Sequence, residues 1–253
     1  MEYSHVTHAD FGPEYDEESR ILVLGSVPSV KSREAAFYYG HPQNRFWRLL
    51  FLLQEAGRLD ARSLADPGTR PKRGQTDRIF SGCLSRIPPV SWARSREEER
   101  SLRRDFPDFP WTKEEKKSFL HANHIAAWDT IAECDIRGSS DASIKNVIPS
   151  DIPSLLAASP IRMILCNGAT SYRYFRKYLT PLLDRFYREH PDREHAHVRQ
   201  LPSTSPANAA WSLEKLALAW DEALCGDLDL ASDGNQKEDQ QKKGQAERMR
   251  RER

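Results

Sequence analysis

Cysteine is scarce in this sequence, and the few cysteines present are far apart. They are Cys83, Cys134, Cys166 and Cys225. No two of them form a CxxC pair, and their spacing matches neither a zinc site nor an iron–sulfur cluster. The pairs His5/His8 and His195/His197 lie in polar, irregular contexts that do not favour a metal site either. We therefore predict that the protein holds no metal and no cofactor.

Long apolar runs are also missing, and so is a signal peptide. A helix that crosses a bilayer needs about 20 consecutive apolar residues, so we expect no membrane partner. Isolated cysteines without a secretory signal are typical of a reducing compartment. These absences predict a cytoplasmic protein, associated with the nucleoid if the source is bacterial. We expect a monomer.

The chain also lacks a large net charge of either sign. The chain has 38 Lys and Arg residues against 37 Asp and Glu residues, which gives a formal net charge of +1. This balance excludes a uniformly basic DNA-binding surface, so any contact with DNA must come from a local patch. Neither the P-loop nor the Rossmann glycine motif is present, which excludes the common nucleotide-binding folds.

The 253 residues suffice for one large α/β domain or two small ones. We expect an irregular, acidic arm over residues 1–19 and one domain over residues 20–225. Prolines and arginines interrupt the pattern at about 57–110, which we interpret as an insertion with a helix at Arg94–Arg104. The polar residues 226–253 are typical of a disordered tail.

Apolar runs alternate with helical patterns along the domain. Ile21–Leu24 and Ile161–Cys166 are continuous apolar runs, as expected of strands buried on both faces. Further strands are predicted at His124–Trp128 and Ala196–Leu201, and helices at Asn44–Gln54, 112–122, Asp151–Ala158, Ser171–Leu183 and 213–224. Alternation of this kind predicts a mostly parallel sheet between helices, with its ligand site beyond the carboxyl ends of the strands.

The most distinctive residues follow the first of these strands. Gly25-Ser-Val-Pro-Ser29 is a turn, and Phe37-Tyr-Tyr-Gly-His-Pro-Gln-Asn-Arg-Phe-Trp47 comes shortly after it. A second polar run, Leu201-Pro-Ser-Thr-Ser-Pro-Ala-Asn208, follows the last strand. We call the two segments Gly25–Ser29 and Phe37–Trp47 together the first motif, and Leu201–Asn208 the second motif.

The two motifs resemble the site-forming motifs of the uracil-DNA glycosylase superfamily, and are most similar to its hypoxanthine-DNA glycosylase branch. The resemblance covers roughly residues 19–225 apart from the insertion. It implies a three-layer α/β/α sandwich with a mostly parallel central sheet. It also implies a monofunctional enzyme that uses water to release a damaged base from DNA.

One position departs from the mismatch-specific uracil-DNA glycosylases, which the first motif otherwise resembles without a gap. At the position of Val27 in this chain, those enzymes have an asparagine, and that asparagine positions the water. The hypoxanthine branch lacks it too, and the asparagine of its His-Pro-x-Asn-Arg-Phe-Trp run is taken as functional. The resemblance therefore makes Asn44 the catalytic candidate, while Asn44 as a helix cap is the structural alternative.

The resemblance also implies residues that contact the extruded base. Tyr39 aligns with the ring that stacks on the base, and its structural alternative is core packing. Asp141 and Ser143 belong to the loop Gly138–Ser143, which resembles the loop that closes over the pocket in the hypoxanthine branch. The alternative for Asp141 is a solvated acid without a role in the site. The predicted base-binding set is Gly25, Ser26, Val27, Tyr39, His41, Asp141 and Ser143.

DNA contacts are expected from three loops. Hydroxyl groups and backbone amides of these loops can bind phosphates. Residues of the second motif can also enter the minor groove. The alternative for the second motif is a helix cap. The predicted DNA-binding set is Ser29, Asn167, Gly168, Ser203, Thr204, Ser205, Ala207 and Asn208. The arginines of the insertion, Arg58 included, form either a DNA-binding patch or a solvated loop.

We therefore expect a DNA glycosylase whose partner is DNA containing a deaminated base, hypoxanthine first. Uracil or xanthine excision by the same pocket is one alternative. A catalytically weak module that binds damaged DNA is another, because Val27 removes one water-binding group.

Overall fold

The computed structural model describes residues 2–8, 11–59, 79–89, 96–138 and 140–225. At its centre lies a parallel sheet in the order β3–β2–β6–β7. Its strands are β2 (Ile21–Gly25), β3 (Ile125–Asp129), β6 (Met163–Asn167) and β7 (His197–Leu201). All three pairings are parallel, so the loops that follow these strands leave from one edge.

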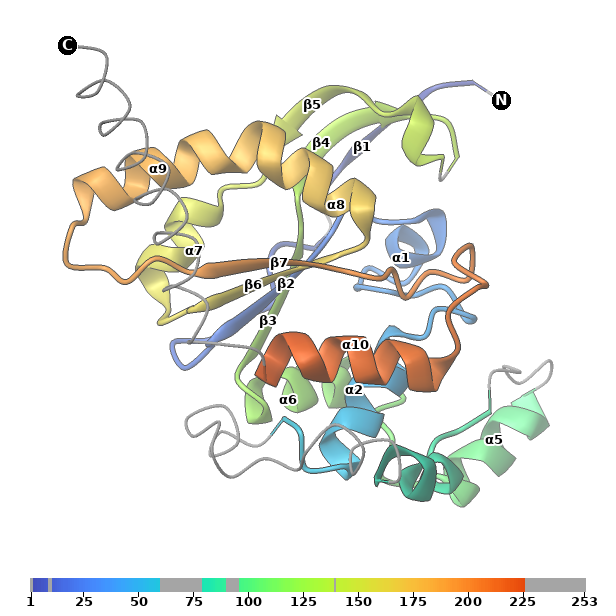
Figure 1. The fold of residues 1–253 in the computed structure, drawn as a ribbon. Coiled ribbons are helices and arrows are strands. Elements are labelled where there is room, and N and C mark those ends of the chain that lie inside the picture. Colours follow the sequence, from blue (N-terminus) through green and yellow to red (C-terminus); the bar gives the residue numbers. More distant parts are fainter. Residues whose placement is uncertain (1, 9–10, 60–78, 90–95, 139, 226–253) are drawn as a thin grey trace, which may run out of the picture.

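Helices cover both faces of this sheet (Figure 1). On β2, Ile21 and Val23 belong to one hydrophobic core, and Leu22 and Leu24 to the other, which explains the continuous apolar run. One face carries α2 (Phe46–Glu55), α6 (Lys113–Ala122) and α10 (Leu213–Cys225), and the other carries α7 (Ile152–Ala158), α8 (Ala169–Tyr174) and α9 (Thr180–Glu189). The predicted three-layer α/β/α fold is confirmed.

A second, antiparallel sheet was not predicted. It consists of β1 (Ser4–Thr7), β4 (Ile131–Ile136) and β5 (Lys145–Pro149), in the order β1–β4–β5. The prediction that residues 1–19 are irregular is therefore wrong for Ser4–Thr7. Val6 is buried there with Cys134 in a small core, and this burial stabilises a strand that the acidic composition of the arm obscures.

The ends of the main helices follow local signals. Thr112 and Glu115 form a reciprocal capping box at the start of α6, which corresponds to the helix predicted at 112–122. Gly57 follows α2 with φ of +67°, a conformation that glycine adopts without strain. The single helix predicted at Ser171–Leu183 is a longer helical run, in which a π-helical turn, η4 (Phe175–Leu179), joins α8 to α9.

The insertion is partly described. Residues 79–83 are helical and are followed by η2 (Leu84–Arg86) and, after residues outside the description, α5 (Arg96–Asp105). The helix predicted at Arg94–Arg104 thus corresponds to α5, although residues 94 and 95 lie outside the described part. Phe80 is buried against the core that contains α2.

Arg58 corrects the prediction of an arginine patch. Its side chain is buried, and its Nε lies 2.5 Å from Oδ1 of Asp221 on α10. Arg58 therefore anchors the start of the insertion to the domain and is not available to DNA. Six further basic residues of the predicted patch lie outside the described residues: Arg62, Arg70, Lys72, Arg73, Arg78 and Arg94. The predicted tail, residues 226–253, lies outside them too.

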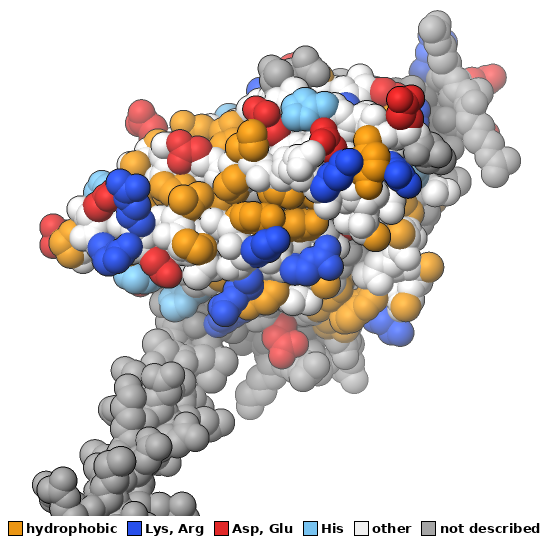
Figure 2. Space-filling view, turned by 90° about the horizontal axis from the view of Figure 1, so that it is seen from above, with side chains coloured by type: hydrophobic (Ala, Val, Ile, Leu, Met, Phe, Trp, Pro, Cys, Tyr) orange, Lys and Arg blue, Asp and Glu red, His pale blue; other side chains and the backbone are white. Residues whose placement is uncertain are grey.

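Lys and Arg side chains are interspersed with Asp and Glu side chains on the face seen in Figure 2. This mixture fits the near-zero net charge. Among the described residues, no helix has the length and apolar character needed to cross a membrane.

Candidate active site

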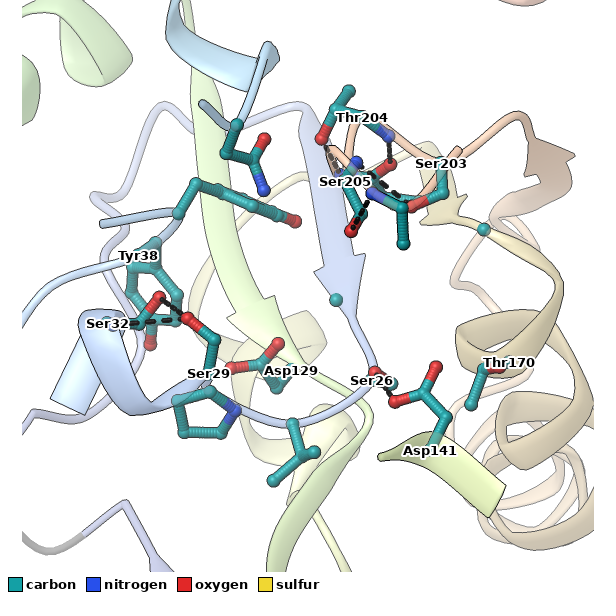
Figure 3. Close-up of a pocket in the computed structure, with 18 of the residues that line it drawn as sticks. Ser26, Ser29, Ser32, Tyr38, Asp129, Asp141, Thr170, Ser203, Thr204 and Ser205 are labelled. Atoms are coloured by element: carbon teal, nitrogen blue, oxygen red, sulfur yellow. Dashed lines mark hydrogen bonds between the residues drawn. The ribbon is translucent and has the colours of Figure 1, made fainter. Parts of the chain in front are cut away.

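A cavity of about 400 Å³ opens at the carboxyl ends of the parallel strands (Figure 3). The loops after β2, β3, β6 and β7 all contribute to it, as the sequence predicted from the strand pattern. Most of the predicted site residues line the cavity: Gly25, Ser26, Val27, Ser29, Tyr39, Asn44, Asp141, Asn167, Gly168, Ser203, Thr204, Ser205 and Ala207.

Three predicted residues lie outside the cavity lining. Nδ1 of His41 accepts a hydrogen bond from the backbone amide of Gln43 at 3.1 Å, which shapes the turn before α2. The Ser143 hydroxyl donates to the Ser140 carbonyl oxygen. Asn208 donates from Nδ2 to the carbonyl oxygen of Ser203 at 2.9 Å, within the second motif. All three side chains have a structural contact that explains their position.

Asn44 lines the cavity at the start of α2. Its Oδ1 accepts a hydrogen bond from the backbone amide of Phe46 at 3.0 Å, which closes an Asx turn. The N-cap of α2 is Arg45, so the alternative that Asn44 is the N-cap is wrong by one residue. An amide oxygen has two lone pairs. The contact with Phe46 therefore fixes the orientation of the side chain and leaves a second acceptor position on the same atom.

Tyr39 is held in an unusual backbone conformation, with φ of +53°. Its ring stacks on Phe46, with 3.7 Å between the ring centroids. Its hydroxyl is buried without a hydrogen-bond partner among the described residues. Burial and the charge of Asp129 raise the pKa of Tyr39 far above its ordinary value, so the hydroxyl keeps its proton and is a potential donor.

The rings that precede Tyr39 belong to the core. Phe37 stacks on Trp47, and the Tyr38 hydroxyl donates to the carbonyl oxygen of Gly12 at 2.6 Å. Both residues are buried. Core packing, the structural alternative considered for Tyr39, thus describes these two neighbouring rings.

Asn167 ties the second motif to the end of β6. Its Nδ2 donates to Oγ1 of Thr204, and its Oδ1 accepts from the backbone amide of Thr204, both at 2.9 Å. Gly168 follows with φ of +109°, and a Cβ there would lie 3.0 Å from Cβ of Ser203. The Asn-Gly pair thus allows the second motif to pack closely against the sheet.

Asp141 lies across the cavity on η3 (Asp141–Ser143), which sits in the loop between β4 and β5. Ser26 donates to its Oδ1 at 3.4 Å. This contact brings the β4–β5 loop to the first motif and partly closes the cavity (Figure 3).

The comparisons with known proteins agree with this geometry. The family model described as the uracil DNA glycosylase superfamily matches residues 13–224. The chain belongs to this superfamily. The match includes both motifs and every residue described above as lining the cavity.

Two curated relatives of this superfamily member are both named hypoxanthine DNA glycosylase. The protein from Methanosarcina barkeri is 55% identical over 40 residues, which is 16% of this chain and 25% of that relative. The protein from Methanosarcina acetivorans is 26% identical over 198 residues, which is 78% of this chain and 85% of that relative. The first relative is therefore matched over only a quarter of its length.

One solved structure is also similar. It is the solution NMR structure of a Methanosarcina acetivorans protein named as a candidate uracil DNA glycosylase. The two chains are 25% identical, and the TM-score is 0.49 over 85% of this chain and 96% of that one.

One acidic residue of this glycosylase-superfamily cavity was not predicted from the sequence. Asp129 ends β3 and projects into the cavity (Figure 3), although the residue is only 5% exposed. A Cβ on Gly25 would lie 2.1 Å from its Oδ1, so the carboxylate occupies the space that a side chain at position 25 would need. The available signal was an acid directly after the apolar residues Ile125–Trp128 at the site-forming end of a strand.

A histidine from the N-terminal arm approaches the same carboxylate. Nε2 of His8 lies 3.3 Å from Oδ2 of Asp129, and both side chains are buried. Burial acts to lower the pKa of His8, but the contact with Asp129 and its charge outweigh burial and raise that pKa above its ordinary value. The contact therefore favours the protonated form of His8.

Arg45 was also missed, because its partners are distant backbone oxygens. Its guanidinium donates to the carbonyl oxygens of Thr204, Ser205, Asn208 and Trp211. Its own backbone amide donates to Thr204 as well, at 3.0 Å. Arg45 therefore connects the first motif to the second and fixes their separation across the cavity.

Proposed function

We propose that this chain is a DNA glycosylase that removes a deaminated base from DNA, with hypoxanthine as its first substrate. The observation that carries the proposal is the cavity that both motifs line, with Asn44 and Tyr39 exposed to it. Its volume of about 400 Å³ falls within the range of ligand pockets. The hypoxanthine branch is favoured because both curated relatives carry that name.

In the proposed reaction the target nucleotide leaves the base stack and its base enters the cavity. The Tyr39 ring, supported from behind by Phe46, provides a flat surface for the base. The bond between C1′ and the base breaks, and its electron pair leaves with the base. The oxygen of a water molecule bonds to C1′, and the proton it loses ends on the released base, so an abasic site remains in the DNA.

Asn44 is the proposed group that positions this water. The contact with Phe46 holds its amide oxygen in one orientation, and the second lone pair accepts a hydrogen bond from the water. Because an amide stays neutral, Asn44 orients the water and does not remove its proton. Positioning suits a reaction in which the sugar develops positive charge before the water attacks.

The proposed DNA contacts come from the loops around the cavity. Ser203 and Ser205 of the second motif lie on its rim, and Gly168 places the backbone of α8 close to them. Hydroxyls and backbone amides in such loops can bind phosphate oxygens. Ala207 and Asn208 would fill the space that the extruded base leaves, and their small side chains make this filling weak.

The decisive experiment compares wild type with Asn44→Ala on labelled duplexes that contain deoxyinosine, deoxyuridine, deoxyxanthosine or no lesion. Alkali then cleaves the strand at each abasic site, and single-turnover rates are measured. Gln43→Ala is the matched control, because Gln43 is an exposed amide in the same turn and does not line the cavity. We expect cleavage at deoxyinosine by wild type and Gln43→Ala, and a loss of about a hundredfold or more in Asn44→Ala.

Each other outcome has a defined meaning. Full activity in Asn44→Ala would remove Asn44 from the mechanism and turn attention to Asp141. Faster release of uracil or xanthine than of hypoxanthine would move the chain to another substrate within the same fold. Binding of the lesion duplexes without cleavage would refute the enzyme and favour a module that recognises damaged DNA.

A further inference from the structure

Two lysines of α6 lie over aromatic rings of the first motif that do not line the cavity. Nζ of Lys113 is 5.7 Å from the centroid of the Phe37 ring, and Nζ of Lys116 is 5.3 Å from that of Trp47. The two rings stack on each other and are buried, whereas both lysines are partly exposed. The aliphatic stems therefore cover the rings and hold two ammonium groups in fixed positions at the surface.

The insertion adds a third cation to these two. Arg103 of α5 lies with its guanidinium carbon 5.9 Å from the centroid of the Trp111 ring, directly before α6. Burial and the charge of Arg103 lower the pKa of Lys116 to about 8, while Glu115 acts in the opposite direction. Arg103 is thus close enough to Lys116 for their charges to repel. We call Arg103, Lys113 and Lys116 the cationic cluster.

The chain does not neutralise the lysines of this cluster. Neither of them forms an ion pair among the described residues, whereas Lys117 on the same helix pairs with Glu14 at 2.7 Å. The nearby carboxylate of Glu115 accepts hydrogen bonds from the backbone amides of Trp111 and Thr112. Cations at the start of a helix also oppose its dipole. Like charges gathered at this position favour an anion from outside the chain.

The topology places the cluster at the same edge of the sheet as the cavity. Helix α6 ends at Ala122 and β3 starts at Ile125, so the helix runs opposite to the strand and begins where the strand ends. Helix α5 of the insertion lies on this side of the domain too (Figure 1). Phe37, beneath Lys113, is only two residues from Tyr39, which lines the cavity. The cluster therefore lies next to the cavity, on the far side of the first motif.

We propose that the cationic cluster binds phosphates of the DNA on one flank of the lesion, where the duplex passes over the first motif. This inference rests on the proposed function, because it takes the cavity as the place where DNA binds. Lys and Arg bind phosphates whatever the base sequence. A duplex that lies across the cavity at this edge of the sheet reaches the cluster directly. The insertion thereby extends the DNA contact surface beyond the loops that line the cavity.

The test removes the two lysine charges and keeps the stems that cover the rings. Lys113→Met/Lys116→Met and wild type are compared for affinity to an undamaged duplex at about 50 to 200 mM salt. Each lost phosphate contact makes the slope of log affinity against log salt shallower by about 0.9, so we expect a change of about 2. Affinity should fall about tenfold to a hundredfold at about 0.1 M salt.

Two further variants separate a local contact from bulk charge. Lys113→Arg/Lys116→Arg keeps both charges and should retain the wild-type slope. Lys177→Met/Arg185→Met also removes two exposed charges, but from η4 and α9 on the opposite face of the sheet, and it should retain the wild-type slope as well. Thermal melting of each variant checks that the fold is intact.

Shortened duplexes locate the contact. With deoxyinosine close to one end or to the other, one flank of the lesion is missing. The affinity difference between wild type and Lys113→Met/Lys116→Met should vanish on one of these two duplexes and persist on the other. The single-turnover rate at saturating enzyme should be the same in both proteins, because the lysines do not line the cavity.

Three results would overturn the proposal. One is a wild-type slope in Lys113→Met/Lys116→Met, and another is an equal change of slope in Lys177→Met/Arg185→Met, which would reflect bulk charge. The third is a lower saturating rate with unchanged affinity, which would assign the lysines to the support of the first motif. Failure of the proposed function is distinguishable, since a wild type that cleaves no lesion still allows the affinity for undamaged DNA to be measured.

Discussion

Replacement of Arg45 by alanine should loosen the second motif and destabilise the domain. The guanidinium donates to four carbonyl oxygens, including Ser205 at 2.5 Å and Asn208 at 3.0 Å, and the residue is only 9% exposed. A hydrogen bond from a charged donor contributes about 1.5–3 kcal/mol, and the contributions of one side chain do not add fully. We therefore expect Arg45→Ala to lower the free energy of unfolding by about 3–5 kcal/mol.

Arg45→Lys should give an intermediate result. An ammonium group is a single point donor and cannot span the carbonyl oxygens that the planar guanidinium reaches together. We expect about half of the loss seen in Arg45→Ala, together with weaker binding of duplex DNA because the loop 203–208 is less fixed.

Urea unfolding measures both changes, provided that the dependence on urea is the same in all variants. Arg185→Ala is the control, since Arg185 is exposed and, among the described residues, its ion pair is with Glu189 one turn away on α9; its midpoint should match wild type. A wild-type midpoint for Arg45→Ala would refute the reasoning. The loop would then be held by its own contacts, such as those between Asn167 and Thr204.

Two further predictions concern the carboxylate at the cavity floor. Gly25→Ala places a Cβ 2.1 Å from Oδ1 of Asp129, so it should lower the free energy of unfolding by about 1–3 kcal/mol and the single-turnover rate at least tenfold. Gly82→Ala is the control, because a Cβ there meets open space, and it should keep the wild-type rate. Equal rates in the two variants would contradict the close contact at Gly25. Because the pKa of His8 is raised in the folded protein, His8 stabilises the fold below about pH 6.5 and loses this contribution as pH rises through its raised pKa. Urea unfolding from about pH 6.5 upward should therefore show a smaller fall in stability for His8→Gln than for wild type; parallel curves would contradict a raised pKa.

The parts of the fold that the sequence predicts are those with a local signal. Ile21–Leu24 is apolar at every position because β2 is buried on both faces, and Thr112 with Glu115 marks the start of α6. The antiparallel sheet has no comparable signal. Ser4 pairs with Ile136, far along the chain, and β5 exposes Ile148, so neither length nor alternation distinguishes these strands from loops.

The site follows the same rule. Asn44 and Tyr39 were predicted because they stand inside a motif whose spacing is specific, and Asn167 because an Asn-Gly pair directly follows a predicted strand. Asp129 is a single acid whose importance depends on three-dimensional neighbours, namely the bare Gly25 and the histidine of the arm. For Arg58 the sequence predicted a DNA-binding patch or a solvated loop, and both are wrong, because composition alone cannot distinguish an exposed arginine from one in a buried ion pair.

Consecutive residues of the first motif, in the turn before α2 and at the start of that helix, have linked tasks. Asn44 lies in the turn before α2 and lines the cavity. The next residue, Arg45, is the N-cap of α2 and holds the second motif through side-chain and backbone donors. Thr204 receives the backbone donor of Arg45 and is bonded on its other side to Asn167. The proposed water site and the proposed DNA-contacting loop are therefore parts of one hydrogen-bonded unit. A substitution that shifts this loop should move the Asn44 oxygen with it, so defects in DNA binding and in bond cleavage should occur together at Arg45.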